Sequence, residues 1–304
     1  MNQRDMGSES YSKSDIEPDD ERLVDMSEMN APSLEIRPKM PLNRQWNLIE
    51  NFAGRDLKAK FNGTLLGWVW SLVVPLSTLL IYSLVFSVVF RMKPPMLGNG
   101  EQGIFAIWLF AGLIIWSFFS SSINGGMNAL TSSGGLLSKI YFPAYAPVLG
   151  SGLAVGVQSL IEVGILLGAF LFVGNIGWTW LLAPFVLALF VIFTQALAVI
   201  VSIFNIFARD LAHLINVALQ LLFYMTPIIY SPDFLPETWN GIPMRSIIEF
   251  SPLAKFVTLF RNNVYDLTTG TWQQWLSVSL WAVGMYLVAV WVNKKHGGDL
   301  AEQI

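Results

Sequence analysis

Few residues in the apolar part of this sequence could do acid–base chemistry. Glu162 is the one acid deep inside an apolar stretch, and Gln158 and Ser159 lie close to it on the same predicted helix. A carboxyl group inside a membrane could carry a proton, because ionising it there is costly and such groups mark transport pathways. A proton-coupled carrier usually needs a relay of these groups. We therefore expect Glu162 to hold helices together through hydrogen bonds, with a transport role as the alternative.

Metal and nucleophilic chemistry have little support in the sequence. The chain contains no cysteine, and its two imidazoles, His213 and His296, are far apart, so we expect no metal site. The phosphate-loop pattern Gly-x-x-x-x-Gly-Lys-Ser/Thr does not occur, nor do Gly-x-Ser-x-Gly and His-Glu-x-x-His. We expect this chain to be no enzyme and to bind no cofactor of its own.

The composition indicates a membrane protein. Of the 304 residues, 54% are hydrophobic and only 13% are charged, whereas soluble domains carry about 25% charged residues. Ten of the 21 acidic residues precede Pro41, so the remaining chain is more apolar still. We predict that residues 1–42 form a disordered acidic cytoplasmic tail, either a docking segment or a solvated extension. The chain has no basic stripe for a nucleic-acid partner.

Several segments are long and apolar enough to cross a bilayer, which takes about 20 residues of helix. They lie at about 65–90, 104–123, 147–173, 178–207, 211–230 and 275–292. The predicted fold class is therefore an all-α polytopic membrane protein with six transmembrane helices, in a transmembrane domain at 63–296.

The positions of Lys and Arg near the ends of these segments predict the orientation. Basic residues precede the first segment, and Lys139, Arg209 and Lys294 lie on the same predicted side. This places both termini, including residues 297–304, in the cytoplasm, with the chain in the cytoplasmic (inner) membrane of a bacterium.

Three segments outside the predicted spans have recognisable patterns. At 43–62 apolar residues recur at three- and four-residue steps with polar residues opposite, which predicts an amphipathic helix on the cytoplasmic membrane surface. Leu136–Phe142, between Gly135 and Pro143, is predicted to protrude into the cytosol. Ser251–Tyr265 is too short to cross and is predicted to re-enter the membrane from outside.

Four stretches resemble the membrane subunit of type-2 ABC exporters, in the branch that exports O-antigen, teichoic acids and related lipid-linked glycans such as galactan. The most specific is NIFARDLAHLINVALQLLFYMTPIIYSPDFLP, at 205–236. RDLKAKFNGTLLGWVWSLVVPL at 55–76, LLSKIYFPAYAPVLG at 136–150 and SPLAKFVTLFRNNVY at 251–265 support it. The chain departs from the family at Ala144 and Tyr145, where many relatives have Arg-Glu.

The resemblance implies a permease that works as two copies with two copies of a cytosolic ABC ATPase, which binds ATP and Mg. Its substrate would be a polyprenyl-diphosphate polysaccharide made on the cytosolic face. Under this interpretation the residues that meet the diphosphate are Arg55, Lys58 and Lys60. The residues that contact the ATPase are Leu137, Ser138, Lys139, Ile140, Tyr141, Phe142 and Pro143. The aromatic residues that line the channel, by stacking on sugars, are Trp68, Trp70, Tyr82, Trp108 and Trp116.

Three other functions stay open. A drug- or lipid-exporting permease shares the architecture, and gene neighbourhood would separate it from a glycan exporter. A membrane-embedded lipid-sugar glycosyltransferase would need paired acids in an external loop, where the acids of this chain are dispersed. An ion-coupled carrier should show an internal inverted repeat.

Overall fold

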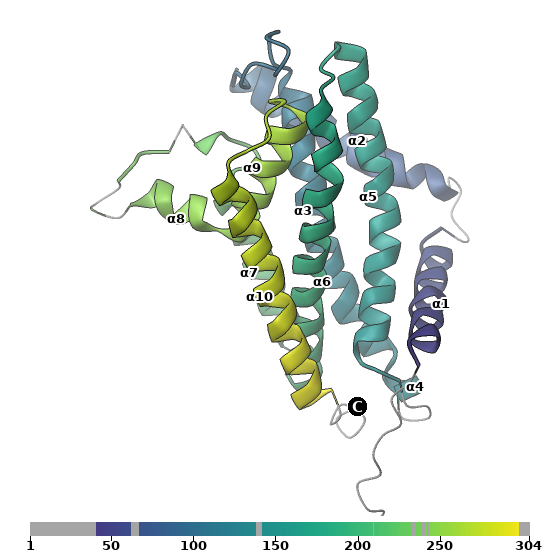
Figure 1. Cartoon of the computed structure of the whole chain (residues 1–304). Coiled ribbons are helices and arrows are strands. Elements are labelled where there is room, and N and C mark those ends of the chain that lie inside the picture. Colours follow the sequence, from purple (N-terminus) through teal and green to yellow (C-terminus); the bar gives the residue numbers. More distant parts are fainter. Residues whose placement is uncertain are drawn as a thin grey trace, which may run out of the picture. The chain divides into compact units, whose positions relative to one another are not determined.

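The computed structural model describes residues 41–61, 67–137, 142–208, 210–232, 235–238, 241 and 243–297, apart from the side chains of Phe61, Trp68 and Leu137. Residues 1–40, which make up most of the predicted acidic tail, lie outside the described residues. Helices make up most of the described part of the chain, and no strand occurs in it (Figure 1).

The helices follow one another in a simple order. They are α1 (Leu42–Phe61), α2 (Trp70–Ser83), α3 (Phe105–Ser132), α4 (Gly134–Leu137), α5 (Tyr145–Val173), α6 (Ala183–Phe207), α7 (Leu211–Met225), α8 (Met244–Phe250), α9 (Pro252–Val264) and α10 (Trp272–His296). Short helical turns precede α2 at Gly67–Val69 and α6 at Trp178–Leu182, and a π-helix, Leu84–Val89, extends α2.

Within the described residues, five helical segments are long and apolar enough to cross a membrane. They are Trp70–Val89, Phe105–Leu136, Tyr145–Val173, Trp178–Phe207 and Trp272–His296. They correspond to five of the six predicted spans. The prediction for 211–230 differs from the structure, because α7 has only 15 residues and ends at Met225. Thr226 is extended, with ψ 134°, as expected for a residue that precedes a proline, here Pro227.

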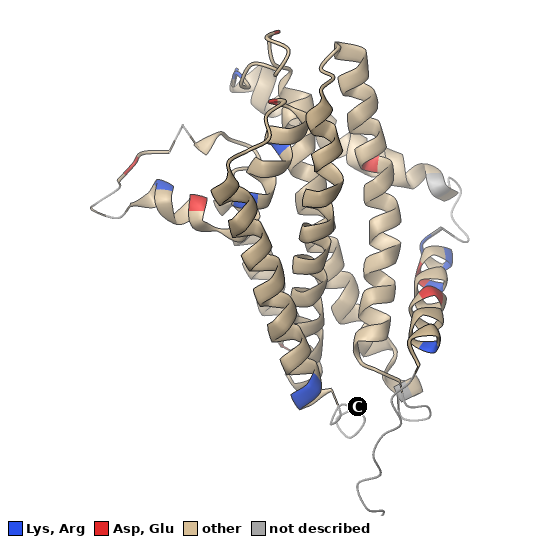
Figure 2. Ribbon diagram, in the orientation of Figure 1, with Lys and Arg blue, Asp and Glu red and all other residues tan. Residues whose placement is uncertain are grey.

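Helix α3 forms the centre of the bundle. It packs along α5 and α6 and also contacts α2, α7 and α9. Neither α3 nor α6 contains a charged residue, and the charges of the described chain gather mainly at helix ends, in loops and on α1 (Figure 2). Most of α3 is buried within this chain, as expected for a helix that other helices surround.

Helix α2 is covered much less by the rest of the chain. It runs obliquely across α3 and α5, and apolar side chains such as Val74, Leu80 and Ile81 are exposed along it. Pro75 lies inside this helix, and the backbone changes to π-helix from Leu84. Lipid or another protein must cover this face of the molecule.

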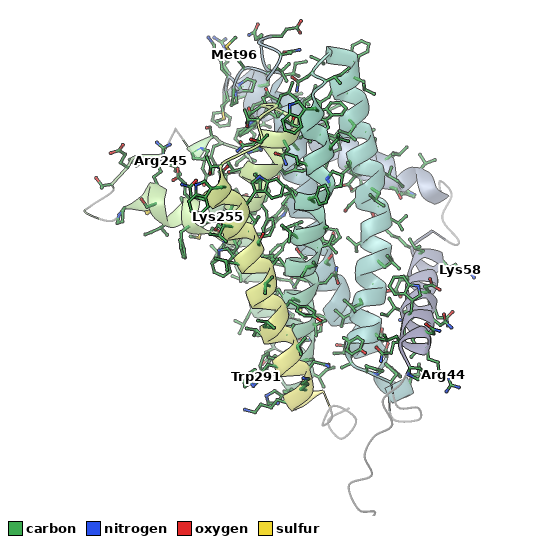
Figure 3. All side chains as sticks on the ribbon, viewed as in Figure 1. Arg44, Lys58, Met96, Arg245, Lys255 and Trp291 are labelled. Carbon is green, nitrogen blue, oxygen red and sulfur yellow. The ribbon has the colours of Figure 1, made fainter. Side chains whose placement is uncertain are left out.

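Helix α1 is amphipathic, as the spacing of its apolar residues predicts. Its apolar residues Ile49, Phe52 and Ala53 are buried, and they pack against the first half of α5. Arg44 and Lys58 lie on the side of α1 away from α5 (Figure 3). The apolar face of this helix is therefore covered largely by protein rather than by lipid alone.

The segment at 251–265, predicted to be external, forms α9, which begins with Pro252 at a position where a missing N–H costs nothing. Its apolar stripe is fully buried against α3, α6 and α10. The helix is confirmed, whereas its re-entry into the membrane stays a prediction.

Gly150 allows α1 to approach α5 closely. A Cβ atom at Gly150 would lie 2.5 Å from the Cβ of Phe52 and 2.9 Å from the carbonyl oxygen of Ile49. We expect Gly150→Ala to displace α1 and to cost about 1–3 kcal/mol, as overpacking does. Gly54→Ala is the matched control, because no atom lies within 4 Å of the added methyl group. Thermal unfolding of the purified chain should show a lower Tm for Gly150→Ala only; equal values would contradict this packing.

Candidate functional site

A polar groove of about 360 Å³ lies between α2, α3 and α7. Each helix contributes a stripe at helical spacing, so the polar side chains of one helix share a face. Helix α2 contributes Thr78 and Tyr82, one turn apart. The other polar residues that line the groove are Ser117, Ser120 and Asn124 from α3, and Asn216, Gln220 and Tyr224 from α7. None of the groove residues carries a charge.

Aromatic rings form part of the groove wall. The rings of Trp116 and Phe223 are 5.3 Å apart between centroids, and those of Tyr82 and Phe223 are 6.1 Å apart. Both Trp116 and Tyr82 line the groove together with the amide and hydroxyl side chains. Hydroxyls, amides and ring faces in one wall can bind a polar, uncharged molecule by hydrogen bonds and stacking.

The other predicted channel residues do not join this wall. Trp70 is exposed on α2, with 44% of its surface accessible, and the side chain of Trp68 lies outside the described residues. Trp108 is buried, and the guanidinium carbon of Arg261 lies 3.6 Å from its ring centroid. The structure therefore brings together Tyr82 and Trp116 and separates them from Trp108.

A second groove has similar size and opposite chemistry. About 380 Å³ in volume, it lies between α1, α3, α5 and α6, and its walls are almost entirely apolar, with residues such as Ile115, Phe118 and Leu160. Ser159 and Gln195 are its only polar lining residues among those the structure describes. The two grooves therefore differ in chemistry, since one has a polar lining and the other an apolar one.

Arg261, in α9, binds both α3 and the chain that follows α7. Its Nη1 and Nη2 donate to the carbonyl oxygens of Pro227 and Ile228, both at 2.7 Å, and its Nε donates to the carbonyl oxygen of Trp108 at 3.2 Å. Only 5% of its surface is accessible. The guanidinium thus satisfies backbone carbonyls that the early end of α7 leaves without helical partners.

Further hydrogen bonds fix α9 to the neighbouring loops. Asn175 Nδ2 donates to the carbonyl oxygens of Val264 and Tyr265, at 3.1 and 3.0 Å, and Thr179 Oγ1 donates to that of Asn263 at 2.7 Å. The Tyr265 hydroxyl donates to the carbonyl oxygen of Pro95 at 2.8 Å. These contacts keep α9 in one position beside the ends of α3 and α7.

The three basic residues predicted to meet a diphosphate differ in their surroundings. Arg55 lies beside Asp56, at 3.3 Å, and its guanidinium carbon is 5.0 Å from the ring centroid of Phe52. Lys58 lies on the outer side of α1 (Figure 3). Lys60 instead extends to α5, where its ammonium donates to Gln158 Oε1. The structure therefore separates Lys60 from the other two.

Glu162 has close polar neighbours. Gln158 Nε2 donates to Glu162 Oε1 at 3.2 Å, and Gln158 Oε1 accepts from Lys60. Glu162 itself is only 2% exposed. The pKa of Lys60 is lowered from its ordinary value, chiefly because burial disfavours its charge, and the Glu162 carboxylate opposes this shift. These contacts favour the interpretation of Glu162 as a residue that ties helices together.

Most of the predicted ATPase-contacting residues, Ser138, Lys139, Ile140 and Tyr141, lie outside the described residues, as does the side chain of Leu137. Pro143 is half-buried. Phe142, predicted to contact the ATPase in a segment that protrudes into the cytosol, is only 3% accessible, and its ring lies 5.5 Å from that of Phe52 between centroids. Within the described residues, no group of three acids or histidines could hold a metal ion.

Residues 49–265 match the ABC-2 type transporter family. This chain belongs to that family. It is thus a multi-pass protein of the bacterial inner membrane and the membrane subunit of a transporter, and its membership implies an ATPase partner.

Similar proteins include two O-antigen export system permease proteins RfbA of Klebsiella pneumoniae. This chain is 28% identical to one over 233 residues, which cover 75% of the chain and 84% of the relative. It is 28% identical to the other over 241 residues, which cover 77% and 87%. The RfbA permease of Myxococcus xanthus is 30% identical over 237 residues, which cover 76% of this ABC-2 chain and 85% of the relative.

Replacing Arg261 tests its role in joining α9, α3 and the chain after α7 in this ABC-2 permease. Arg261→Met leaves the carbonyl oxygens of Pro227 and Ile228 without their donor, and each buried polar group left unsatisfied costs about 1–3 kcal/mol. We expect the largest fall in Tm for this variant and a smaller fall for Arg261→Lys, whose single ammonium cannot reach all three acceptors. Lys255→Met on the same helix is the control, because Lys255 lies 5.8 Å from the ring centroid of Phe250 and binds no carbonyl at the end of α7. An unchanged Tm for Arg261→Met would refute the assignment.

Proposed function

We propose that this chain is the permease of an ATP-driven exporter that moves a polyprenyl-diphosphate-linked polysaccharide, such as an O-antigen-like glycan or a cell-wall galactan, out of the cytoplasm. The observation that carries the proposal is the uncharged polar groove between α2, α3 and α7. The names of the RfbA relatives support it, since those proteins are O-antigen export permeases.

The chemistry of the groove suits a sugar chain. A polysaccharide presents hydroxyl groups and flat ring faces along its length, and the groove offers amides, hydroxyls and the rings of Tyr82 and Trp116. These contacts do not require one sugar sequence, so a polymer can slide past them. An ion-coupled mechanism finds no support here, because the groove contains no ionisable relay.

Two copies of the chain would enclose the path. The groove is open in one copy, and the helices beside it, α2 and α7, expose apolar side chains such as Leu80, Leu214 and Leu221. A second copy packed on these faces would cover them and complete the wall around the cargo. The exporter is thus a homodimer in this proposal.

The energy would come from two copies of a cytosolic ABC ATPase, which bind ATP and Mg, because this chain has no phosphate loop. The proposed contact is the segment at 137–143. Phe142 anchors the end of this segment on α1, which leaves residues 137–141 for the partner.

Six crossings would place both termini in the cytoplasm. At about 1.5 Å per residue, the 15 residues of α7 span roughly 22 Å, less than the roughly 30 Å of hydrocarbon. The non-helical residues from Thr226 onward would complete this crossing. Irregular backbone at that depth is tolerated only where protein or water covers it, and Arg261 binds its carbonyls. Helix α9 would then re-enter the membrane from outside.

Arg55 and Lys58 would meet the diphosphate at the cytosolic face. Both are exposed on α1, and the diphosphate is anionic. Attraction of the same residues to anionic lipid headgroups is the alternative.

A second candidate function is export of a lipid or a drug. The apolar groove between α1, α3, α5 and α6 favours it, because an acyl chain or an apolar drug fits such walls. The two functions differ in which groove the cargo follows.

Depletion of the gene should cause a lipid-linked glycan to accumulate in the cytosol-facing leaflet. A variant with both Tyr82→Ala and Trp116→Ala loses two stacking rings, each worth about 0.5–1.5 kcal/mol, so export should fall by roughly tenfold. Trp291→Ala is the matched control, because Trp291 is 58% exposed on α10, outside both grooves. Labelled glycan, extracted from each leaflet, is the measurement. If a phospholipid or a drug accumulated in place of a glycan, the second function would hold.

A further inference from the structure

Helix α1 contacts the end of the ATPase-facing segment. The ring of Phe142, which ends that segment, lies 5.5 Å from the ring of Phe52 in α1. The hydroxyl of Tyr145, three residues further on, donates to Gln45 Oε1 at 2.7 Å. Gly150 then lets Phe52 and Ile49 approach the backbone of α5. The first part of α1 is therefore bound to the chain that leaves the segment at 137–143.

The last part of α1 is bound to a different level of α5. Lys60 donates to Gln158, and Gln158 donates to Glu162 at 3.2 Å. Gln158 and Glu162 are one helical turn apart, so both lie on the same side of α5. Between Tyr145 and Gln158, α5 rises roughly 20 Å at about 1.5 Å per residue. Helix α1 thus joins the cytosolic end of α5 to the middle of that helix.

The contact of Lys60 with Gln158 matters because it brings a cation close to the buried acid Glu162. Glu162 is the one acid within the membrane-spanning helices of the described chain, and it is 2% exposed. A buried carboxylate is costly unless a cation and hydrogen bonds compensate it. The amide of Gln158 connects the cation to the carboxylate, because its oxygen accepts from Lys60 while its nitrogen donates to Glu162. The chain Lys60–Gln158–Glu162 therefore favours one position of α1 on α5.

We propose that Lys60, Gln158 and Glu162 form a positioning link that makes α1 transmit movement of the ATPase-facing segment to the polar groove. This inference rests on the proposed function, because it assumes that an ATPase moves that segment. Only residues 62–66 separate α1 from the helical turn that begins α2, and α2 contributes Thr78 and Tyr82 to the groove. Movement of α1 therefore reaches the groove through a short piece of chain.

The link assigns Lys60 a role different from that of Arg55 and Lys58. If Lys60 bound the diphosphate, its loss and the loss of Glu162 would act independently, and their effects would add. If the two residues act through one link, the second loss should add little to the first. A double-mutant cycle separates these two possibilities.

The experiment uses the full complex of the chain with its ATPase. Lys60→Met, Glu162→Gln and the double variant replace the wild-type chain in cells depleted of it. Export is measured as the ratio of surface glycan to lipid-linked glycan on the cytosolic side, at equal amounts of complex recovered by pull-down. ATP hydrolysis is measured on the purified complex in vesicles of the cell's own lipids. Lys295→Met is the matched control, because its ammonium lies over the Trp291 ring, 5.1 Å from the centroid, far along the chain from α1.

We expect each single variant to hydrolyse ATP while exporting roughly fivefold less glycan per ATP, a size typical of coupling between sites. The double variant should export no less than Lys60→Met, and the charge-swapped variant, Lys60→Glu with Glu162→Lys, should recover part of the loss. Additive losses in the double variant, or single variants that export like wild type, would overturn the link. Failure of the proposed function would look different, since depletion of the wild-type chain would then leave no lipid-linked glycan behind.

Discussion

The hydrocarbon interior of a membrane offers no partner to a polar group, and this constraint organises the structure. Each polar group at that depth must bind protein or meet water. Arg261 shows the first solution, because it donates to the carbonyl oxygens of Pro227 and Ile228, just after α7, and to that of Trp108 in α3. The groove between α2, α3 and α7 requires the second, because its amides and hydroxyls lie on open helix faces. Under the proposed function, this groove is the path of a polar cargo.

The sequence predicted the long helices well, because an uninterrupted run of apolar residues has few other stable conformations in a bilayer. The fifth predicted span was wrong in its length. Hydropathy alone predicts that the helix continues through the apolar residues Ile228 and Ile229. In the structure the helix ends before Thr226 and Pro227. What stabilises the break is Arg261, 34 residues further along the chain, and only the folded structure brings the two together.

The site was predicted less completely. Residue type alone predicts Tyr82 and Trp116, which line the groove, but also Trp108, whose ring lies under Arg261. The polar stripes of α3 and α7 were readable at three- and four-residue spacing, for example Asn216 and Gln220. Glu162 looked isolated because its nearest cation, Lys60, is 102 positions earlier in the sequence. Contacts of that separation depend on how α1 packs, which no local pattern specifies.

If the polar groove carries a polar cargo, water must enter it, and the absence of cysteine from the sequence makes this access directly measurable. Single cysteines at Ser120, in the polar groove, and at Ser159, in the apolar groove, can be exposed to a charged, membrane-impermeant thiol reagent in vesicles containing the assembled complex. This account predicts rapid labelling of Ser120→Cys and protection of Ser159→Cys. Equal labelling, or labelling of Ser159→Cys alone, would contradict it.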